Sequence, residues 1–157
     1  MATVFVLGPS FLQSGEKALL QVRQELADMF REGGHHAFLM EEQADKKGED
    51  IVDKFYRLVE ENAVSDIVVY WPDGAKMQTT YDELILLRAR MDVIKVPTIW
   101  ILHHASVATI TEDEFKVNEP GNRSRYLDGV ARLGVRPLAW DADQELRDLA
   151  RLLATEL

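Results

Sequence analysis

Residues 66–74 read DIVVYWPDG, a short apolar run that ends abruptly. β-Branched and aromatic residues in an unbroken run are typical of a strand buried on both faces of a sheet. Pro72, Asp73 and Gly74 follow, and a Pro-Asp-Gly sequence breaks regular structure. The segment therefore predicts a buried β-strand over residues 66–71 with a turn directly after it.

Similar runs occur on both sides of this segment, and helical patterns separate them. Before it, TVFVL at 3–7 stops at Gly8-Pro9, and apolar positions at helical spacing then run over 16–32 until Gly33-Gly34. The further expected strands cover 37–40, 97–102 and 135–139. The further expected helices open at Glu49 and Asp50, cover 81–91 and 125–133, and begin near Asp143.

Strands that alternate with helices indicate a parallel sheet covered on both faces. Because crossover connections are right-handed, we expect a three-layer, doubly wound α/β fold with a five-stranded parallel sheet. The flavodoxin-like strand order 2-1-3-4-5 is the simplest arrangement. No linker or repeat divides the chain, so we expect one domain over residues 1–157.

Composition narrows the classes of function. The chain has 157 residues, no cysteine and a formal net charge of -9. A chain of this length buries roughly 70% of its unfolded surface without a disulfide or metal. The acidity argues against a nucleic-acid partner, and no leader or membrane span is expected. A chain without cysteine suits a cytoplasmic location.

Ligands of doubly wound folds bind beyond the carboxyl ends of the strands. That rule selects Gly8-Pro9-Ser10-Phe11, Met40-Glu41-Glu42, Trp71-Pro72-Asp73-Gly74 and His103-His104. The first of these has no phosphate-loop pattern, and a simple turn explains it. As a site, its Phe11 would stack on a base and its Ser10 would offer a hydrogen bond.

Two histidine pairs in one sequence suggest a metal site, but their expected positions in the sheet argue against it. His35-His36 precedes a strand and His103-His104 follows one, so the pairs should lie at opposite ends of the sheet. No metal and no cofactor is therefore expected, although His103 alone is a candidate for contact with a ligand.

Residues 71–84 carry the most information about chemistry. They run from the end of a strand through a polar loop into an apolar helix, with Glu83 in the first helical turn. One interpretation is a capping box, with Thr80 as the N-cap and Glu83 three residues later. The other is a carboxylate placed at the ligand-binding edge of the sheet.

This segment resembles the catalytic segment of two related groups, the nucleoside 2-deoxyribosyltransferase-like family and the TIR domain family, whose enzymatic members cleave NAD. In both, an essential glutamate begins the helix after the third strand, and the matching residue here is Glu83. Asp73-Gly74 resembles the Asp-Gly pair of the transferases, and Tyr81 with Glu83-Leu84 resembles the TIR segment. The spacing from Asp73 to Glu83 is longer than in the transferases, and the TIR tryptophan-cysteine pair is absent.

The resemblance implies cleavage or transfer at the N-glycosidic bond of a nucleoside, nucleotide or NAD-like substrate. Glu83 would stabilise or attack the anomeric carbon, and Asp73 or Glu41 would be the second carboxylate. Phe11 and Trp71 would be walls for the base. The remaining candidates for substrate contact are Gly8, Pro9, Ser10, Tyr81 and His103.

Two other functions stay open. One is a non-catalytic nucleotide-sensing or protein-interaction module on the same fold. The other is a flavodoxin-type or receiver-type domain, which Gly8-Pro9 disfavours because a receiver needs acidic residues there. The long connection over 103–123 is either a lid or a plain insertion. The apolar run 84–87 favours burial in a homodimer.

Overall fold

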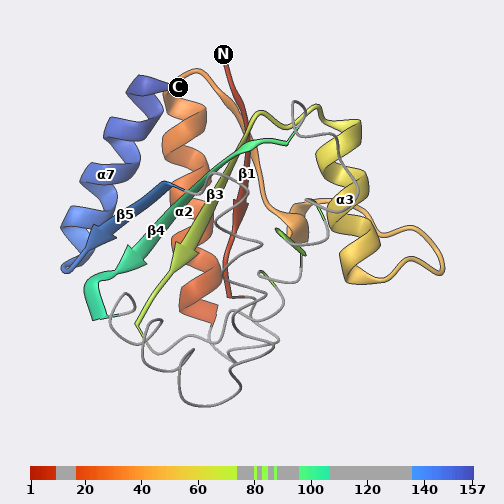
Figure 1. Ribbon diagram of the computed structural model, residues 1–157, viewed down its shortest axis with the longest axis horizontal. Coiled ribbons are helices and arrows are strands. Elements are labelled where there is room, and N and C mark those ends of the chain that lie inside the picture. Colours follow the sequence, from red (N-terminus) through yellow and green to blue (C-terminus); the bar gives the residue numbers. More distant parts are fainter. Residues whose placement is uncertain (10–16, 74–79, 81–82, 85–86, 88–95, 107–135) are drawn as a thin grey trace.

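Parallel strands form one sheet in the computed structural model, in the order β2-β1-β3-β4-β5 (Figure 1). The structure describes residues 1–9, 17–73, 80, 83, 84, 87, 96–106 and 136–157. The predicted flavodoxin-like order is thus confirmed. The strands are β1 Thr3–Leu7, β2 His36–Phe38, β3 Asp66–Trp71, β4 Thr98–His104 and β5 Arg136–Trp140.

Helices cover both faces of the sheet, as the doubly wound prediction requires (Figure 1). Helices α2 (Lys17–Glu32) and α7 (Asp143–Glu156) pack against one face, and α3 (Ile51–Glu61) packs against the other. Side chains alternate between the two faces along each strand. In β1, for example, Val4 and Val6 join the α2–α7 core, whereas Phe5 and Leu7 join the α3 core.

The helix expected after β3 also lies on the α3 face. Its described residues Thr80, Glu83, Leu84 and Leu87 are helical. Leu84 and Leu87 are buried in the same core as Phe55 of α3. A single chain therefore already covers these two leucines, without the dimer contact that the apolar run suggested for them.

Strand β2 is shorter than predicted, because a 3-10 turn, η1 (Met40–Glu42), replaces its last residues. The Glu42 carboxylate accepts a hydrogen bond from the Leu39 amide at 2.8 Å and contacts Arg31 of α2 at 2.9 Å. With these contacts the chain turns at Leu39 and Met40, although these two apolar residues predicted that the strand would continue.

Strand β4 is longer than predicted and includes both histidines. His103 pairs with Trp71 of β3, and His104 pairs with Trp140 of β5. The predicted connection over 103–123 therefore begins as strand. Its residues from 107 onward, the expected helix over 125–133 and most of 81–91 lie outside the described residues. In the described part, no helix is long and apolar enough to cross a membrane.

One histidine joins three distant parts of the chain at the amino end of the sheet. The His35 ring accepts a hydrogen bond from the Ala2 amide at its Nδ1 (3.0 Å). Its Nε2 lies 2.7 Å from the Ala154 carbonyl of α7. The ring can satisfy both contacts as the neutral Nε2–H tautomer. We refer to this arrangement as the His35 clasp.

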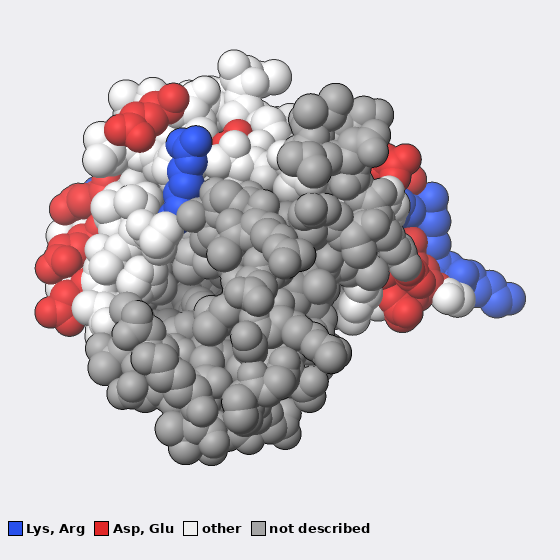
Figure 2. Space-filling model, viewed as in Figure 1, with Lys and Arg blue, Asp and Glu red and all other residues white. Residues whose placement is uncertain are grey.

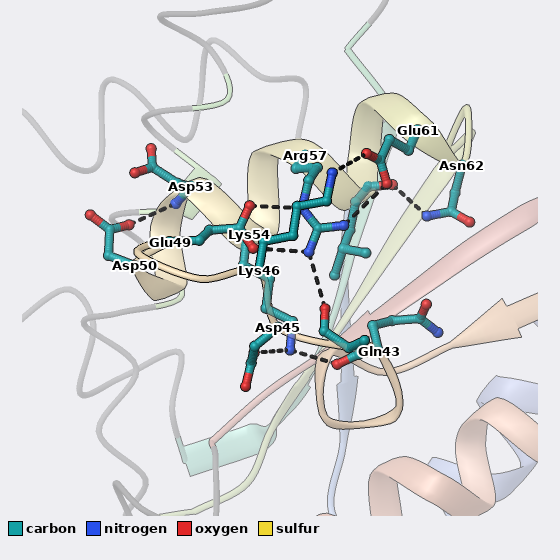
Figure 3. Close-up of polar contacts among 12 residues, drawn as sticks. Gln43, Asp45, Lys46, Glu49, Asp50, Asp53, Lys54, Arg57, Glu61 and Asn62 are labelled. Carbon is teal, nitrogen blue, oxygen red and sulfur yellow. Dashed lines mark hydrogen bonds and ion pairs between the residues drawn. The ribbon is translucent and has the colours of Figure 1, made fainter.

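A network of ion pairs fixes the chain between η1 and α3 (Figure 3). Arg57 of α3 contacts Glu49 at 2.7 Å and Glu61 at 3.1 Å, and donates to the Ala44 carbonyl. Lys54 donates to the Gln43 carbonyl at 2.8 Å and to Asp45 at 2.7 Å.

Both signs of charge therefore gather around α3, whereas acidic side chains dominate the outer face of α7 (Figure 2). The α3 network thus helps to hold η1 in place.

Candidate functional site

The carboxyl ends of the strands meet at the lower edge of the sheet in Figure 1, and we call this edge the carboxyl rim. Gly8 and Pro9 follow β1 and Glu41 follows β2, in η1. Asp73 follows β3, and Ser106 follows β4. The rim thus collects residues from four segments of the chain, as expected for this fold. Ser10, Phe11 and Tyr81 lie outside the described residues.

Asp73 is linked to the end of β4 by two short polar contacts of the Ser106 hydroxyl, which we call the rim relay. The Ser106 hydroxyl donates to the Asp73 carboxylate at 2.8 Å. The same oxygen lies 2.7 Å from Nδ1 of His104. The register of β3 and β4 makes this possible, because Trp71 and His103 are paired two residues before Asp73 and one before His104.

The other contacts of His104 decide how its protons are arranged. Its Nδ1 accepts a hydrogen bond from the Ser106 amide at 3.2 Å, which requires a bare nitrogen there. Its Nε2 then carries the proton and donates to the Asp141 carbonyl at 3.1 Å. The ring also packs edge-on against Trp140, with ring centroids 5.0 Å apart. The His104 ring is therefore held from both sides, with Nδ1 toward Ser106 and Nε2 toward Asp141.

His103 and Trp71, the remaining candidates on these strands, are both half-buried. Nδ1 of His103 lies 3.1 Å from the carbonyl oxygen of His104. Trp71 packs against the α3 core. Within the described residues, the structure thus brings Asp73 together with His104 and Ser106. Ser106 was not among the predicted site residues, and His104 was selected only as part of the rim segment His103-His104.

Glu41 lies in a different contact at the same rim. Arg23 of α2 binds it through two parallel hydrogen bonds, Nη1 to Oε2 and Nη2 to Oε1, both 3.0 Å long. The Arg23 side chain is only 2% exposed, whereas that of Glu41 is 37% exposed. Bidentate pairing of this kind is strong and directional. Glu41 is therefore held as a carboxylate at the surface end of a buried guanidinium.

Sequence reasoning missed Arg23, although a signal for it exists. Arg23 precedes Leu26 by three residues, Ala27 by four and Phe30 by seven, and all three face the core. Residues at this spacing share one face of a helix. An arginine on the apolar face of a helix requires a partner, and a search for that partner among rim carboxylates would have selected Glu41.

Gly8, directly after β1, lies against the side chain of Arg23. A Cβ atom at Gly8 would lie 2.8 Å from Cδ of Arg23 and 2.9 Å from the carbonyl oxygen of Tyr70. Both separations are shorter than normal packing allows. Glycine here is explained by the close approach of α2 and β3, and Arg23 thereby reaches the junction of β1 and β3.

Glu83 is a buried carboxylate, with 4% of its surface exposed. It lies on the helix after β3, beside the core residue Leu84. Thr80 is already helical, so it lies inside the helix rather than at the N-cap that the capping-box interpretation requires. A buried charge near a ligand-binding edge is a candidate for function.

The histidine pairs lie at opposite ends of the sheet, as predicted. His36 pairs with Thr3 at the start of β1, and His104 pairs with Trp140 at the end of β5. Among the described residues, no group of three or more His, Asp or Glu side chains is arranged to hold a metal ion.

Comparison with known proteins supports the fold. No family model and no curated protein matches the chain. Among solved structures, the chain is similar to a conserved protein from Enterococcus faecalis V583, with a TM-score of 0.59 and 16% sequence identity. The match covers 100% of this chain and 99% of the other. Similarity at this identity concerns the arrangement of the backbone and does not determine function.

Proposed function

We propose that this protein cleaves or transfers the N-glycosidic bond of a nucleoside, nucleotide or NAD-like substrate at the carboxyl rim. The observation that carries the proposal is the burial of Glu83, which is 4% exposed on the helix that follows β3. A carboxylate shielded from water interacts more strongly with developing positive charge than an exposed one. This position also matches the essential glutamate of the families that the sequence resembles.

In the proposed reaction, the bond between the anomeric carbon and the base nitrogen breaks, and its electron pair leaves with the base. Glu83 stabilises the resulting oxocarbenium character or attacks the carbon to form a covalent glycosyl-enzyme. A proton is supplied to the base, and water or an acceptor hydroxyl then completes the reaction. The products are the free base and either the free sugar or a new glycoside.

Asp73 is a better second carboxylate than Glu41. Asp73 is exposed at the rim, and its contact to Ser106 is a single hydrogen bond that a substrate hydroxyl can replace. Glu41 makes two hydrogen bonds to a buried guanidinium, and loss of that partner would leave a buried charge unpaired. Phe11 and Trp71 remain the proposed walls for the base, and Gly8, Pro9, Ser10, Tyr81 and His103 the proposed substrate contacts.

A nucleotide-sensing or interaction module is the second candidate, and one observation favours it. Both Asp73 and Glu41 are engaged with other side chains in the protein without ligand. A site that only binds needs no free acid or base. We also propose a cytoplasmic location, from the absence of cysteine, and a homodimeric assembly.

The deciding experiment is the release of free base from a panel of nucleosides, nucleotides and NAD, followed by chromatography. Glu83→Gln should abolish release, while ligand binding stays measurable by calorimetry. The matched control is Asp66→Asn, because Asp66 is also buried but begins β3 at the opposite edge and accepts from Trp100 and Ser65. Release that persists in Glu83→Gln contradicts the catalytic role, and no release by the parent favours the sensing module.

A further inference from the structure

We propose that Arg23 anchors a subsite for a phosphate group at the carboxyl rim, and that Glu41 occupies this subsite in the ligand-free protein. The proposal starts from the chemistry of the pair. The two Nη groups of Arg23 present a flat fork to Glu41, with both contacts at 3.0 Å. The same fork fits two oxygens of a phosphate as well as those of a carboxylate.

The burial of the two partners shows from which side an anion can reach the fork. Arg23 is 2% exposed and Glu41 is 37% exposed. Glu41 therefore forms the solvent side of the pair. A rotation of the Glu41 side chain toward water would uncover the Nη groups while the rest of the arginine stays in the core. A ligand anion can then take the place of Glu41, so that the guanidinium is paired both before and after the exchange.

A second observation points to an incomplete site. The Nε atom of Arg23 is buried and has no hydrogen-bond partner within the described part of the chain. Buried donors are normally paired, because each unpaired one loses its hydration without compensation. The Nε–H group of Arg23 thus stays unpaired among the described residues, although both Nη groups donate to Glu41.

The position of Arg23 agrees with a ligand site. Its Cδ atom lies against Gly8, which in turn lies against the Tyr70 carbonyl of β3. This is the junction of β1 and β3, where the strand order reverses its direction of growth. Ligands of doubly wound folds bind at this switch point. A phosphate at Arg23 would therefore lie at the mouth of the same crevice as the proposed glycosidic site.

A neighbouring pair on the same helix provides an internal comparison. Arg31 lies eight residues after Arg23 and contacts Glu42, the next residue after Glu41. Here both partners are similarly exposed, at 38% and 34%, and the arginine is also shared with Asp28. An exposed pair of this kind holds η1 to α2 and contributes little energy. Of these two pairs on α2, it is the Arg23 pair that combines a buried cation with a more exposed anion.

The inference specifies the substrate class of the proposed function, and for that part it rests on the proposed function: a nucleoside 5′-phosphate would be favoured over the free nucleoside. Binding of inorganic phosphate itself does not depend on any glycosidic reaction. The two ideas therefore fail separately, since one is measured by phosphate affinity and the other by release of base.

The test is calorimetric titration with inorganic phosphate at low ionic strength. Glu41→Gln removes the competing anion and should tighten phosphate binding by about tenfold or more, since hydrogen bonds to charged groups are worth roughly 1.5–3 kcal/mol. Glu42→Gln changes the net charge equally and should leave the affinity unchanged. Arg23→Gln in the Glu41→Gln background should abolish the gain.

Circular dichroism checks that each variant is folded. If the double variant with Arg23→Gln is not, Arg23→Lys with Glu41→Gln replaces it, and the loss of the planar fork should reverse most of the gain. In a second titration, Glu41→Gln should prefer a nucleoside 5′-monophosphate over its nucleoside.

The proposal is overturned if Glu41→Gln binds phosphate no better than the parent, or if Glu42→Gln gains as much. Retention of the gain without an arginine at position 23 also overturns it. In each case the Arg23–Glu41 pair is a structural clamp only.

Discussion

The Ser106 hydroxyl has one proton and two acceptors within 2.8 Å, the Asp73 carboxylate and Nδ1 of His104. It can donate to only one of them at a time. Because the Ser106 amide also donates to Nδ1, the hydroxyl is free to stay with Asp73. When the hydroxyl donates to Asp73, this hydrogen bond orients the Asp73 carboxylate from the segment that follows β4.

This arrangement predicts a graded response to substitution. Asp73→Asn should lower base release by about 10²–10⁴-fold if Asp73 is the acid or base. Ser106→Ala should lower it by about tenfold, since an unheld carboxylate is in place less often. Ser106→Thr keeps the hydroxyl and should recover most of the loss. Steady-state rates measure this, and a Ser106→Ala variant as fast as the parent contradicts a positioning role.

A substitution at Gly8 tests the close approach of α2 to β1. Gly8→Ala places a methyl group 2.8 Å from Arg23 and 2.9 Å from the Tyr70 carbonyl, so backbone must move. We expect the free energy of unfolding to fall by about 1–3 kcal/mol, measured with urea. Gly34→Ala is the comparison, because Gly34 has φ of +88° but no atom near its absent Cβ. That variant should lose only about 1 kcal/mol.

Helix α2 carries both a structural and a candidate functional role along one face. Its apolar residues form the core with β1 and α7, while Arg23 and Arg31 contact the two glutamates of η1. Helix α2, which precedes β2 in the chain, therefore sets the position of the carboxyl end of β2.

The same contacts explain which elements were predictable from the sequence. Apolar runs such as TVFVL and DIVVYW indicate strand positions, because burial on both faces tolerates few polar residues. The strand order came from the alternation of strands with helices and from the simplest arrangement of such folds. The end of β2 was not predictable, because η1 depends on Arg31, a long-range partner. The sequence did not predict the last residues of β4, because His103 and His104 are polar. Their strand conformation depends on pairing with Trp71 of β3 and Trp140 of β5.

The candidate site was also predictable from the sequence only in part. Sequence patterns selected the rim and Asp73, Glu83 and Glu41. They placed His104 at the rim without a role, and they did not select Ser106 or Arg23, because the contacts of these residues join separate elements. The sequence analysis considered only the apolar positions of the helix over 16–32, and Arg23 is buried among them.

The α3 network makes a prediction about pH. Hydrogen bonds from Arg57 lower the pKa of Glu49 below its ordinary value of 4.5, and Lys46 and Arg57 lower the pKa of Glu61. Lys54 lowers the pKa of Asp45 in the same way. Groups with a lowered pKa in the folded protein stabilise it fully above their unfolded pKa and lose this effect as pH falls. Stability should therefore decrease as the pH falls below 4.5.

Arg57→Gln tests the origin of this effect. The variant should be less stable than the parent at pH 7, and the difference should shrink toward pH 3 as the carboxylates are protonated in both proteins. Urea unfolding at several pH values measures it. Arg151→Gln, which removes a well-exposed pair with Asp148, should give a smaller and nearly constant difference. A difference for Arg57→Gln that does not vary with pH contradicts the assignment.

At the scale of the whole molecule, two separate cores lie on the two faces of one sheet. Large side chains fill each of them, among them Phe30 on the α2–α7 side and Phe55 on the α3 side. Leu87 belongs to the α3 core and is fully buried within one chain. The stability of each chain therefore rests on contacts that need no partner subunit.

Burial of Leu87 within one chain and assembly into a dimer therefore lead to two separate predictions. Leu87→Ala should reduce the free energy of unfolding by about 2–5 kcal/mol, by the same amount at all protein concentrations if it acts within the chain. Light scattering at micromolar concentration should give the mass of a dimer under the proposed assembly. A monomer in that measurement removes the dimer proposal and leaves the expectation for Leu87 intact.

The His35 clasp has a consequence for folding experiments. The Ala2 amide is protected by a side chain whose orientation depends on the Ala154 carbonyl, more than 100 positions later in the chain. Undocking of α7 would free the ring, and the Ala2 amide would then exchange with solvent deuterium. The rate of exchange at this one amide therefore reports the attachment of the carboxyl-terminal helix, while the central strands stay protected.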